Sequence, residues 1–177
     1  LKRGILESYE KEVGRLQVSV CRLQEPNPLS PAQEKAYGEI HEAFKTKEVC
    51  LLHGVTSSGK TEIYVRLIHE VLRLGRQVLY MLPEIAITTQ ITERLAKLFG
   101  DKLLVYHSKF SDNERVEVWN KLLHNDEPML VLGVRSSLFL PFKDLGLIIV
   151  DEEHENTYKQ QDPAPRYHAR NAAIVLA

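Results

Sequence analysis

Short apolar runs alternate with amphipathic segments along most of the chain. Continuous apolar runs predict strands over residues 49–53, 78–82, 103–106, 129–133 and 147–150. Apolar positions at helical spacing predict helices over residues 30–47 and 85–99, a helix that follows a Gly-rich turn and ends at Gly75, and another that follows Ser111. Because strands that are apolar throughout are buried on both faces, this order predicts an α/β fold with a mainly parallel, doubly wound sheet.

Recognisable capping residues stand before two of the expected helices. Ser30 precedes Pro31 and Gln33, and Ser111 precedes Glu114. Each Ser lies three residues before a Gln or Glu, the spacing at which the two side chains cap the first turn reciprocally. Pro31 suits the first helical position. We therefore expect helices to begin directly after residues 30 and 111.

Residues 1–24 differ from the rest, because apolar and polar residues alternate there without a helical stripe. This alternation predicts a hairpin, and the sequence Glu-Pro-Asn-Pro over residues 25–28 predicts a linker. We therefore divide the chain into a short N-terminal appendage with its linker, residues 1–28, and a principal domain, residues 29–177. The first residue is Leu rather than Met, and residues 168–177 stop within a predicted helix, so we expect a fragment of a longer protein.

The composition is that of an ordinary globular protein, with 44% hydrophobic and 27% charged residues. No apolar run approaches the roughly 20 residues that a membrane-spanning helix needs, so we expect a cytoplasmic protein with no membrane partner. Cys21 and Cys50 form no CxxC pair, which argues against a disulfide framework or a thiolate zinc site. A net charge of -1 argues against a protein that coats nucleic acid electrostatically, but it is compatible with a narrow DNA track.

The strongest chemical signal is the sequence GVTSSGKT at residues 54–61, which matches the P-loop pattern G-x-x-x-x-G-K-[ST]. It lies between a predicted strand and a predicted helix, where glycines let backbone N–H groups face a phosphate chain and the helix N-terminus adds partial positive charge. Lys60 is expected to hold the β- and γ-phosphates of ATP, and the Thr61 hydroxyl to ligate Mg²⁺. The expected nucleotide-binding residues are Gly54, Val55, Thr56, Ser57, Ser58, Gly59, Lys60 and Thr61.

An acidic signal follows the last predicted strand, in the sequence IIVDEEH at residues 148–154. P-loop enzymes hold Mg²⁺ partly through an acidic residue at the end of a neighbouring strand, and Asp151 stands in that position. Glu152 can then polarise the attacking water. An acidic cluster alone is more often a solvated loop, but this one follows an apolar strand in a chain that carries a P-loop. We therefore expect Lys60, Asp151 and Glu152 to form the catalytic group.

Together these motifs resemble the superfamily-two helicases, and among them the PriA family of bacterial primosomal replication-restart DNA helicases (primosomal protein N-prime). Residues 151–154 look like the DEAH-type box of that superfamily. Further sequence motifs typical of the family occur in order along the chain: GVTSSGKTE at 54–62, LPEI at 82–85, YHS at 106–108, GVRSSLF at 133–139, YKQQ at 158–161 and RYHAR at 166–170. The resemblance implies the first RecA-like lobe of an ATP-dependent 3′-to-5′ DNA helicase that acts in replication restart and primosome assembly.

The resemblance also assigns nucleotide-side roles that spacing alone does not show. Gln33 looks like the Q-motif glutamine that contacts adenine, although its capping role is about equally good and both can hold. Glu62 extends the nucleotide-binding set. His154 is expected to link the nucleotide to the strand-binding site.

DNA contacts are likewise implied by the resemblance. The expected DNA-binding residues are Pro83, Glu84, Thr88, Gln90, His107, Ser108, Arg135, Ser136, Tyr158 and Tyr167. The tyrosines belong to residues 158–167, which resemble an aromatic-rich loop on which bases can stack. Two ordinary alternatives stay open: Arg135 or Ser136 as a plain loop or cap residue, and the Tyr-bearing segment as a common surface loop.

Parts of the family's machinery are absent from this sequence. The family has a second RecA-like lobe that supplies arginines to the γ-phosphate, and zinc-binding cysteines. The resemblance therefore implies ATP and Mg²⁺ for this chain, zinc only elsewhere in the longer protein, and an isolated lobe that is nearly inactive. Residues 1–28 are a candidate tail of the family's winged-helix domain.

The implied partners are single-stranded and forked DNA and the proteins of replication restart. Two other functions remain open on the sequence alone. One is a different superfamily-two DNA translocase, and the other is a nucleotide-binding module without motor activity.

Overall fold

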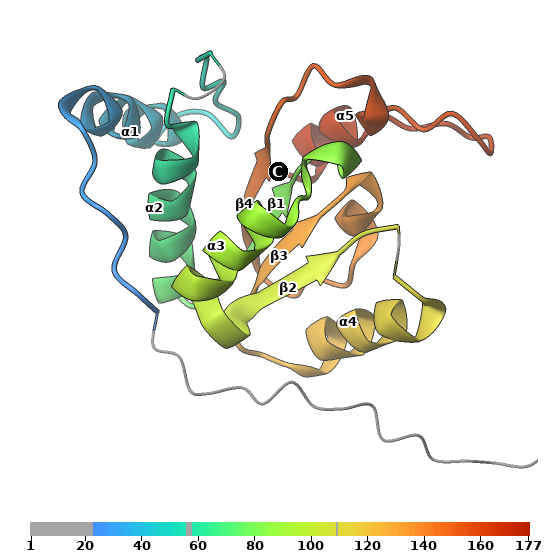
Figure 1. Ribbon diagram of the computed structural model, residues 1–177. Coiled ribbons are helices and arrows are strands. Elements are labelled where there is room, and N and C mark those ends of the chain that lie inside the picture. Colours follow the sequence, from blue (N-terminus) through green and yellow to red (C-terminus); the bar gives the residue numbers. More distant parts are fainter. Residues whose placement is uncertain (1–22, 56–57, 109) are drawn as a thin grey trace, which may run out of the picture.

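The computed structural model describes residues 23–55, 58–108 and 110–177. Its centre is a four-stranded sheet in which all neighbouring strands run parallel, in the order β2-β3-β1-β4 (Figure 1). The strands are β1 (Gln77–Met81), β2 (Leu103–Tyr106), β3 (Leu130–Gly133) and β4 (Leu145–Val150). The expected α/β fold with a parallel sheet is confirmed. The hairpin predicted in residues 1–24 falls almost wholly outside the described residues.

Helices connect the strands and cover the sheet. They are α1 (Pro31–Phe44), α2 (Lys60–Arg73), α3 (Thr89–Phe99), α4 (Asp112–His124) and α5 (Ala169–Leu176), with 3-10 turns η1 (Glu84–Ala86), η2 (Gly100–Lys102), η3 (Arg135–Phe139) and η4 (Asn156–Tyr158). The capping boxes predicted at Ser30 and Ser111 are both present. None of the helices in the described ranges is long and apolar enough to cross a membrane.

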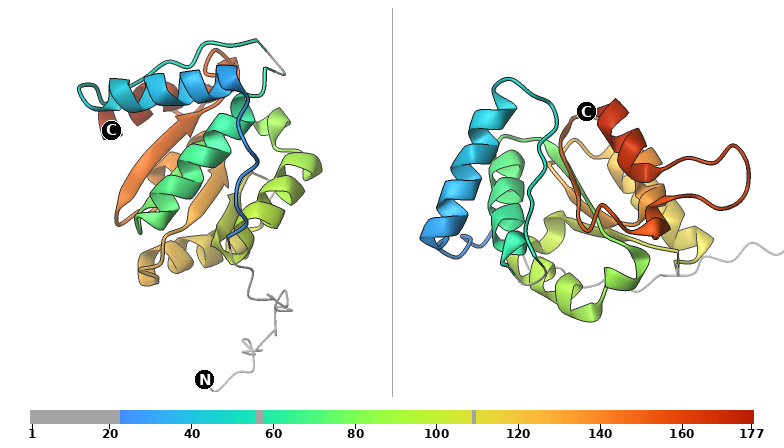
Figure 2. Two further views of the ribbon diagram at one scale, coloured as in Figure 1. Left: turned by 90° about the vertical axis from the view of Figure 1, so that its left-hand side faces the viewer. Right: turned by 90° about the horizontal axis from the view of Figure 1, so that it is seen from above.

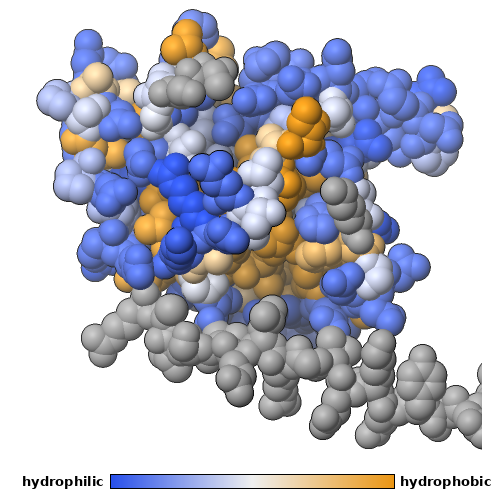
Figure 3. All heavy atoms as spheres, viewed as in Figure 1, coloured by the Kyte–Doolittle hydropathy of each residue, from blue (hydrophilic) through white to orange (hydrophobic). Residues whose placement is uncertain are grey.

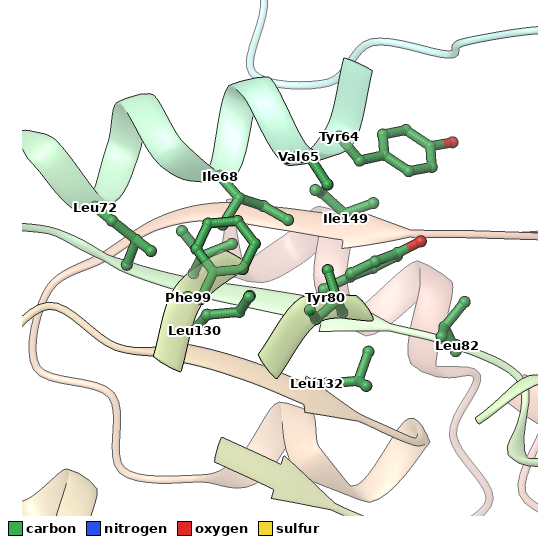
Figure 4. Packing of buried hydrophobic residues seen from close by; sticks show 12 residues of the cluster. Tyr64, Val65, Ile68, Leu72, Tyr80, Leu82, Phe99, Leu130, Leu132 and Ile149 are labelled. Carbon is green, nitrogen blue, oxygen red and sulfur yellow. The ribbon is translucent and has the colours of Figure 1, made fainter. Parts of the chain in front are cut away.

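The sheet is buried on both faces, as its uninterrupted apolar strands predict. On one face, Val78 and Tyr80 of β1 pack with residues of α2 and α3 (Figure 4). On the other face, Leu79 and Met81 pack with residues of α4, η3 and α5. Alternate β1 side chains thus enter opposite cores, which is the doubly wound arrangement. The further views show α1 outside α2, on the same side of the sheet (Figure 2).

The helix expected over residues 85–99 is divided in the structure. Residues 84–86 form the 3-10 turn η1, and α3 begins only at Thr89. Thr88 is the reason, because its hydroxyl accepts a hydrogen bond from the Ile91 N–H at 3.4 Å and its extended backbone caps the helix. The end of the helix is as predicted, with Gly100 at a φ of 53° as the C-cap.

The strand expected over residues 49–53 does not form, and this prediction is wrong. In residues 23–55, which the structure describes, no strand precedes α2. Cys50 and Leu52 pack against the core beside α1, α2 and Leu147 of β4, whereas Val49 and Leu51 point to solvent, Leu51 being 73% exposed. The run is held through alternate side chains rather than through a ladder of backbone hydrogen bonds. An apolar run alone does not distinguish these two states.

Candidate functional site

The N-terminus of α2 lies where the P-loop motif predicts it. Gly59 is the N-cap residue, with φ 82° and ψ 20° in the left-handed region that glycine adopts without steric cost. Glycine has no side chain that could cap the helix, and helix N-termini bind anions through backbone N–H groups of the first turn. Thr61 lies in this first turn and is half-buried. The start of α2 and its glycine N-cap are thus where the motif predicts them, and phosphate binding there stays a prediction.

Lys60 extends back over the loop that precedes α2. Its ammonium donates hydrogen bonds to the carbonyl oxygens of Gly54 at 2.5 Å and Val55 at 3.4 Å. Ser58 closes a turn within the same loop through its N–H, 3.2 Å from the Val55 carbonyl oxygen. The loop carbonyls thus hold the lysine cation over the loop, and a phosphate that binds there would replace them as its partners. Thr56 and Ser57 lie outside the described residues.

Gln33 connects α1 to this loop. Its Nε2 donates to the Gly59 carbonyl at 3.0 Å, while its Oε1 accepts from the Ser30 N–H at 2.8 Å. The capping role considered in the sequence is therefore confirmed, and the same amide also contacts the residue that caps α2. The adenine contact stays a prediction.

Asp151 stands at the carboxyl end of β4. Its N–H continues the ladder with β1 by donating to the Met81 carbonyl at 3.0 Å. One carboxylate oxygen, Oδ2, accepts from the Tyr80 hydroxyl at 3.0 Å, and the other, Oδ1, accepts from the Glu152 N–H at 3.0 Å. Glu152 has a φ of 47°, the one positive φ at a non-glycine residue among the described parts of the chain. This strained backbone lies at the predicted catalytic carboxylate, where such conformations tend to occur.

Tyr64 of α2 packs against Tyr80 of β1, which is hydrogen-bonded to Asp151. Their rings pack edge to face with centroids 5.7 Å apart, and both hydroxyls point toward the same end of the sheet (Figure 4). Burial raises the pKa of both phenols, and the negative charge of Asp151 raises each of them further. Because Tyr64 lies one helical turn beyond Lys60, the first turn of α2 and the Asp151 carboxylate lie at the same end of the sheet.

The donor set at this end fits Mg²⁺ held together with a nucleotide. Among the residues that the structure describes, no three His, Cys, Asp or Glu side chains come close enough to hold a metal ion. Mg²⁺ is usually held by one or two carboxylates plus substrate phosphates rather than by an all-protein cage. Asp151 offers the carboxylate, and Thr61 offers a hydroxyl in the first turn of α2.

Two other predicted residues on this side are Glu62 and His154. Glu62 turns toward α3, where its carboxylate accepts a hydrogen bond from Arg94, so its side chain is engaged in joining two helices. His154 is exposed, and its predicted linking role stays a prediction. Glu153, its neighbour, anchors the acidic turn to α5 through Arg170, whose Nη1 lies 2.6 Å from its Oε2.

A cleft of about 380 Å³ lies beyond the carboxyl ends of β1, β2 and β3. Ligands in open α/β sheets bind at this edge. Of the predicted DNA-binding residues, the cleft is lined by Pro83, Glu84, Ser108, Arg135, Ser136 and Tyr158. Four others lie outside its lining: Thr88, Gln90, His107 and Tyr167. The loop between η4 and α5 projects from the molecule near this edge, and its surface is mainly hydrophilic (Figure 3).

Three of these four residues, Thr88, His107 and Tyr167, have structural contacts of their own. Thr88 caps α3, and His107 packs on Phe110 with ring centroids 4.1 Å apart. Tyr167 packs edge to face on Phe139 at 4.9 Å, and its hydroxyl donates to the Arg135 carbonyl at 3.4 Å.

Tyr158 has a different environment from the one expected. Its side chain is 1% exposed, and its hydroxyl lies 2.7 Å from the Asp151 carbonyl oxygen and 3.1 Å from that of Met81. Burial, followed by the negative charge of Asp151, raises its pKa, so it remains a neutral donor. A ring enclosed in this way cannot stack on a base in this conformation. The expectation of direct stacking by Tyr158 is therefore corrected to a packing role beneath the cleft.

Arg135 holds the floor of the cleft to the loop that carries Tyr158. Its Nη1 donates to the carbonyl oxygens of Thr157 at 3.3 Å and Lys159 at 3.1 Å. The predicted DNA-contacting arginine is thus tied by backbone contacts to the segment that follows Asp151.

Tyr64 and Tyr80 were not predicted as site residues from the sequence. The signal that could have indicated them is that a tyrosine in a buried apolar segment needs a hydrogen-bond partner for its hydroxyl.

The family model for DEAD/DEAH box helicases matches residues 30–174. The chain belongs to the DEAD/DEAH box helicase family. The match covers the P-loop, the acidic turn after β4 and the cleft, so it agrees with the RecA-like lobe that the fold shows.

Curated relatives confirm the resemblance to the PriA family. The chain is similar to the Replication restart protein PriA of Bacillus subtilis, with 43% identity over 100% of this chain and 22% of the relative. It is 46% identical to the Haemophilus influenzae protein of the same name, over 84% of this chain and 20% of the relative. The chain therefore spans about a fifth of the length of these relatives.

One solved structure is similar in fold. It is the ATP-dependent Type ISP restriction-modification enzyme LlaBIII bound to DNA, with a TM-score of 0.58 and 19% sequence identity. The similarity covers 87% of this chain and 12% of that chain. At this identity the likeness supports the fold alone.

Proposed function

We propose that this chain is the ATP-binding lobe of an ATP-dependent DNA helicase that acts in replication restart and primosome assembly with 3′-to-5′ polarity. The observation that carries the proposal is the placement of the first turn of α2 and the Asp151 carboxylate at the same end of the sheet, where the cleft that contains Arg135 also opens. The relatives named Replication restart protein PriA support the restart role. Residues 29–177 form the lobe, and residues 1–28 are an appendage to it.

On the nucleotide side, residues of the chain act by positioning the phosphates of ATP, the metal ion and the attacking water. ATP binds with its phosphates at the N-terminus of α2, where Lys60 exchanges the loop carbonyls for the β- and γ-phosphates. Thr61 and Asp151 would hold Mg²⁺, which when bound neutralises charge on the phosphates. Glu152, whose own backbone is strained, directly follows Asp151 and accepts the proton of the attacking water.

The DNA side uses the cleft and its surroundings. Arg135 contributes positive charge for a phosphate of single-stranded DNA, and Ser108 and Ser136 contribute hydroxyls. The carbonyl partners of Arg135 lie on residues 157–159, which follow the acidic turn, so strand binding and nucleotide binding are connected through one loop. Forked DNA and restart proteins are the partners of the whole protein, which we expect in the cytoplasm.

A second lobe of the full-length protein supplies arginines to the γ-phosphate in this proposal. Removal of an arginine that stabilises the transition state costs about 10³–10⁵ in rate in comparable P-loop enzymes. The isolated lobe should therefore bind ATP but hydrolyse it very slowly. Brisk hydrolysis by the isolated lobe would show that the site is self-sufficient and would contradict the two-lobe arrangement.

The test uses the full-length protein. ATP hydrolysis is measured with and without single-stranded DNA, and unwinding is measured on forks whose single-stranded tail has either 3′ or 5′ polarity. We expect hydrolysis that DNA stimulates, and unwinding that requires translocation in the 3′-to-5′ direction. Hydrolysis without any response to DNA would support a nucleotide-binding module instead. Translocation on DNA without unwinding would support a different superfamily-two translocase.

A further inference from the structure

Tyr80 lies in the middle of the sheet, on the strand between β3 and β4. Its side chain is 1% exposed, and its ring packs in the core formed with α2 and α3. The hydroxyl is directed out of this core and donates to Asp151 Oδ2 at 3.0 Å. A leucine or phenylalanine would fill such a position with apolar atoms alone, whereas the tyrosine directs a hydrogen-bond donor at the residue that our proposed function assigns to the metal.

The Asp151 carboxylate is held from two independent elements. Tyr80 on β1 binds Oδ2, and the Glu152 N–H in the following turn binds Oδ1. The Asp151 backbone is fixed as well, through the Met81 carbonyl at 3.0 Å and the Tyr158 hydroxyl at 2.7 Å. A carboxylate constrained at both oxygens has its rotamer selected before a metal ion arrives. Hydrogen bonds of this kind orient metal ligands in many metalloproteins and affect metal affinity.

We propose that Tyr80 is a positioning residue that orients the Asp151 carboxylate for the Mg²⁺ that accompanies ATP. This inference rests on the proposed function, because it requires Asp151 to be a metal ligand. The Tyr80 hydroxyl does not touch nucleotide or metal; it acts through Asp151. It donates to one oxygen, which retains further lone pairs with which it could bind a metal ion.

The Tyr80 ring is also held in place from the neighbouring helix. Tyr64 packs edge to face against it and lies on the nucleotide side of the sheet, which limits the directions open to the Tyr80 ring.

The test compares two substitutions in the full-length protein. Tyr80→Phe removes the hydroxyl and retains the ring. Tyr37→Phe is the matched control, because the Tyr37 hydroxyl also donates to a carboxylate, Glu70 Oε2 at 2.8 Å, between α1 and the outer side of α2. Mn²⁺ serves as the paramagnetic probe. Its affinity for the protein with ADP is measured by electron paramagnetic resonance, and the affinity for ADP without metal is measured by calorimetry.

We expect Tyr80→Phe to weaken Mn²⁺ binding by about 10-fold, the lower end of the range for loss of a partner that orients a metal ligand. Metal-free ADP binding should not change, and neither should either quantity in Tyr37→Phe. ATP hydrolysis should need about 10-fold more Mg²⁺ for half-maximal rate, with the KM for ATP at saturating Mg²⁺ unchanged. In an Asp151→Asn background, Tyr80→Phe should have no further effect on Mn²⁺ binding.

Several outcomes would overturn the inference. Equal Mn²⁺ affinity in Tyr80→Phe and the parent would show that the hydroxyl does not orient the ligand. Loss of metal-free ADP binding in Tyr80→Phe would show that the hydroxyl is needed for the structure of the lobe instead. The proposed function itself, as distinct from the role of Tyr80, would be contradicted if the parent protein bound neither ADP alone nor Mn²⁺ together with ADP.

Discussion

The Nε2 of Gln33 donates a hydrogen bond to the carbonyl of Gly59 at 3.0 Å, which ties the first turn of α1 to the residue that caps α2. The other amide atom of Gln33, Oε1, accepts from the Ser30 N–H and completes the capping box of α1. One side chain therefore stabilises its own helix and holds the loop that precedes another. The two effects can be separated by substitution.

Ser30→Ala and Gln33→Ala both remove one half of the capping box. Each should lower the free energy of unfolding of the lobe by about 1 kcal/mol, the usual cost of losing an N-cap. Only Gln33→Ala also releases Gly59, so only that variant should lower the affinity for ADP. Thermal unfolding and calorimetric titration measure the two quantities. If Ser30→Ala lowered ADP affinity equally, nucleotide binding would depend on α1 as a whole rather than on the contact with Gly59.

Lys60→Ala should abolish nucleotide binding in the full-length protein. The substitution removes the cation that meets the β- and γ-phosphates, and charge-assisted hydrogen bonds of this kind are among the strongest in proteins. It also removes contacts to the carbonyl oxygens of Gly54 and Val55, but these lie in a part-buried to exposed loop, so the fold should remain intact. Calorimetric titration with ADP and Mg²⁺ tests this prediction. Unchanged affinity would contradict the assignment of the P-loop.

Most features that were predicted correctly depend on residues that lie close together in the sequence. The capping box of Ser111 and Glu114 and the start of α2 after the Gly-rich turn depend on neighbours a few residues away, and the structure contains both. The apolar runs of β1 to β4 correctly indicated strands buried on both faces. The parallel arrangement then brings the ends of the strands, and with them Asp151 and Arg135, to one edge.

Errors arose where distant parts of the chain decide the outcome. The apolar run at residues 49–53 packs through alternate side chains, and whether it also pairs with β4 depends on backbone contacts that its sequence does not encode. Tyr158 follows the acidic turn in a segment that was expected to offer aromatic rings to DNA bases, yet its buried hydroxyl is hydrogen-bonded to the carbonyls of Asp151 and Met81. Similarly, nothing in the apolar run around Tyr80 indicated that its hydroxyl would meet Asp151.

Arg135→Ala and Glu152→Gln should have opposite effects in the full-length protein. Arg135→Ala removes a cation from the cleft and releases the carbonyl oxygens of Thr157 and Lys159, so DNA binding and DNA-stimulated hydrolysis should fall while ADP affinity is kept. Glu152→Gln removes the base but retains the turn, so hydrolysis should stop while DNA binding is kept. Fluorescence anisotropy with single-stranded DNA and a hydrolysis assay measure both.

The salt dependence of binding provides a control for this pair. Each lost phosphate contact lowers the slope of log affinity against log salt by about 0.7 on single strands. Arg135→Ala should therefore show a shallower slope than the parent, and Glu152→Gln the same slope. If both variants merely lowered ATP affinity together, Arg135 would belong to the nucleotide pocket and the cleft would not be a DNA track.

Tyr158→Phe distinguishes a buried tyrosine from one that stacks on DNA. The substitution retains the ring but removes the hydroxyl, which lies 2.7 Å from the Asp151 carbonyl oxygen and 3.1 Å from that of Met81. Buried carbonyls left without this donor should lower the free energy of unfolding by about 1–3 kcal/mol. Tyr167→Phe is the control, because its half-buried hydroxyl makes one long contact of 3.4 Å, so its effect should stay within about 0.5 kcal/mol. If Tyr158 instead stacked on a DNA base, Tyr158→Phe would leave the free energy of unfolding unchanged. DNA affinity would then fall only in Tyr158→Ala, which removes the ring, and the lobe of that variant would remain folded. Thermal unfolding of the variants, with DNA affinity measured by anisotropy, therefore separates the buried role found here from direct stacking.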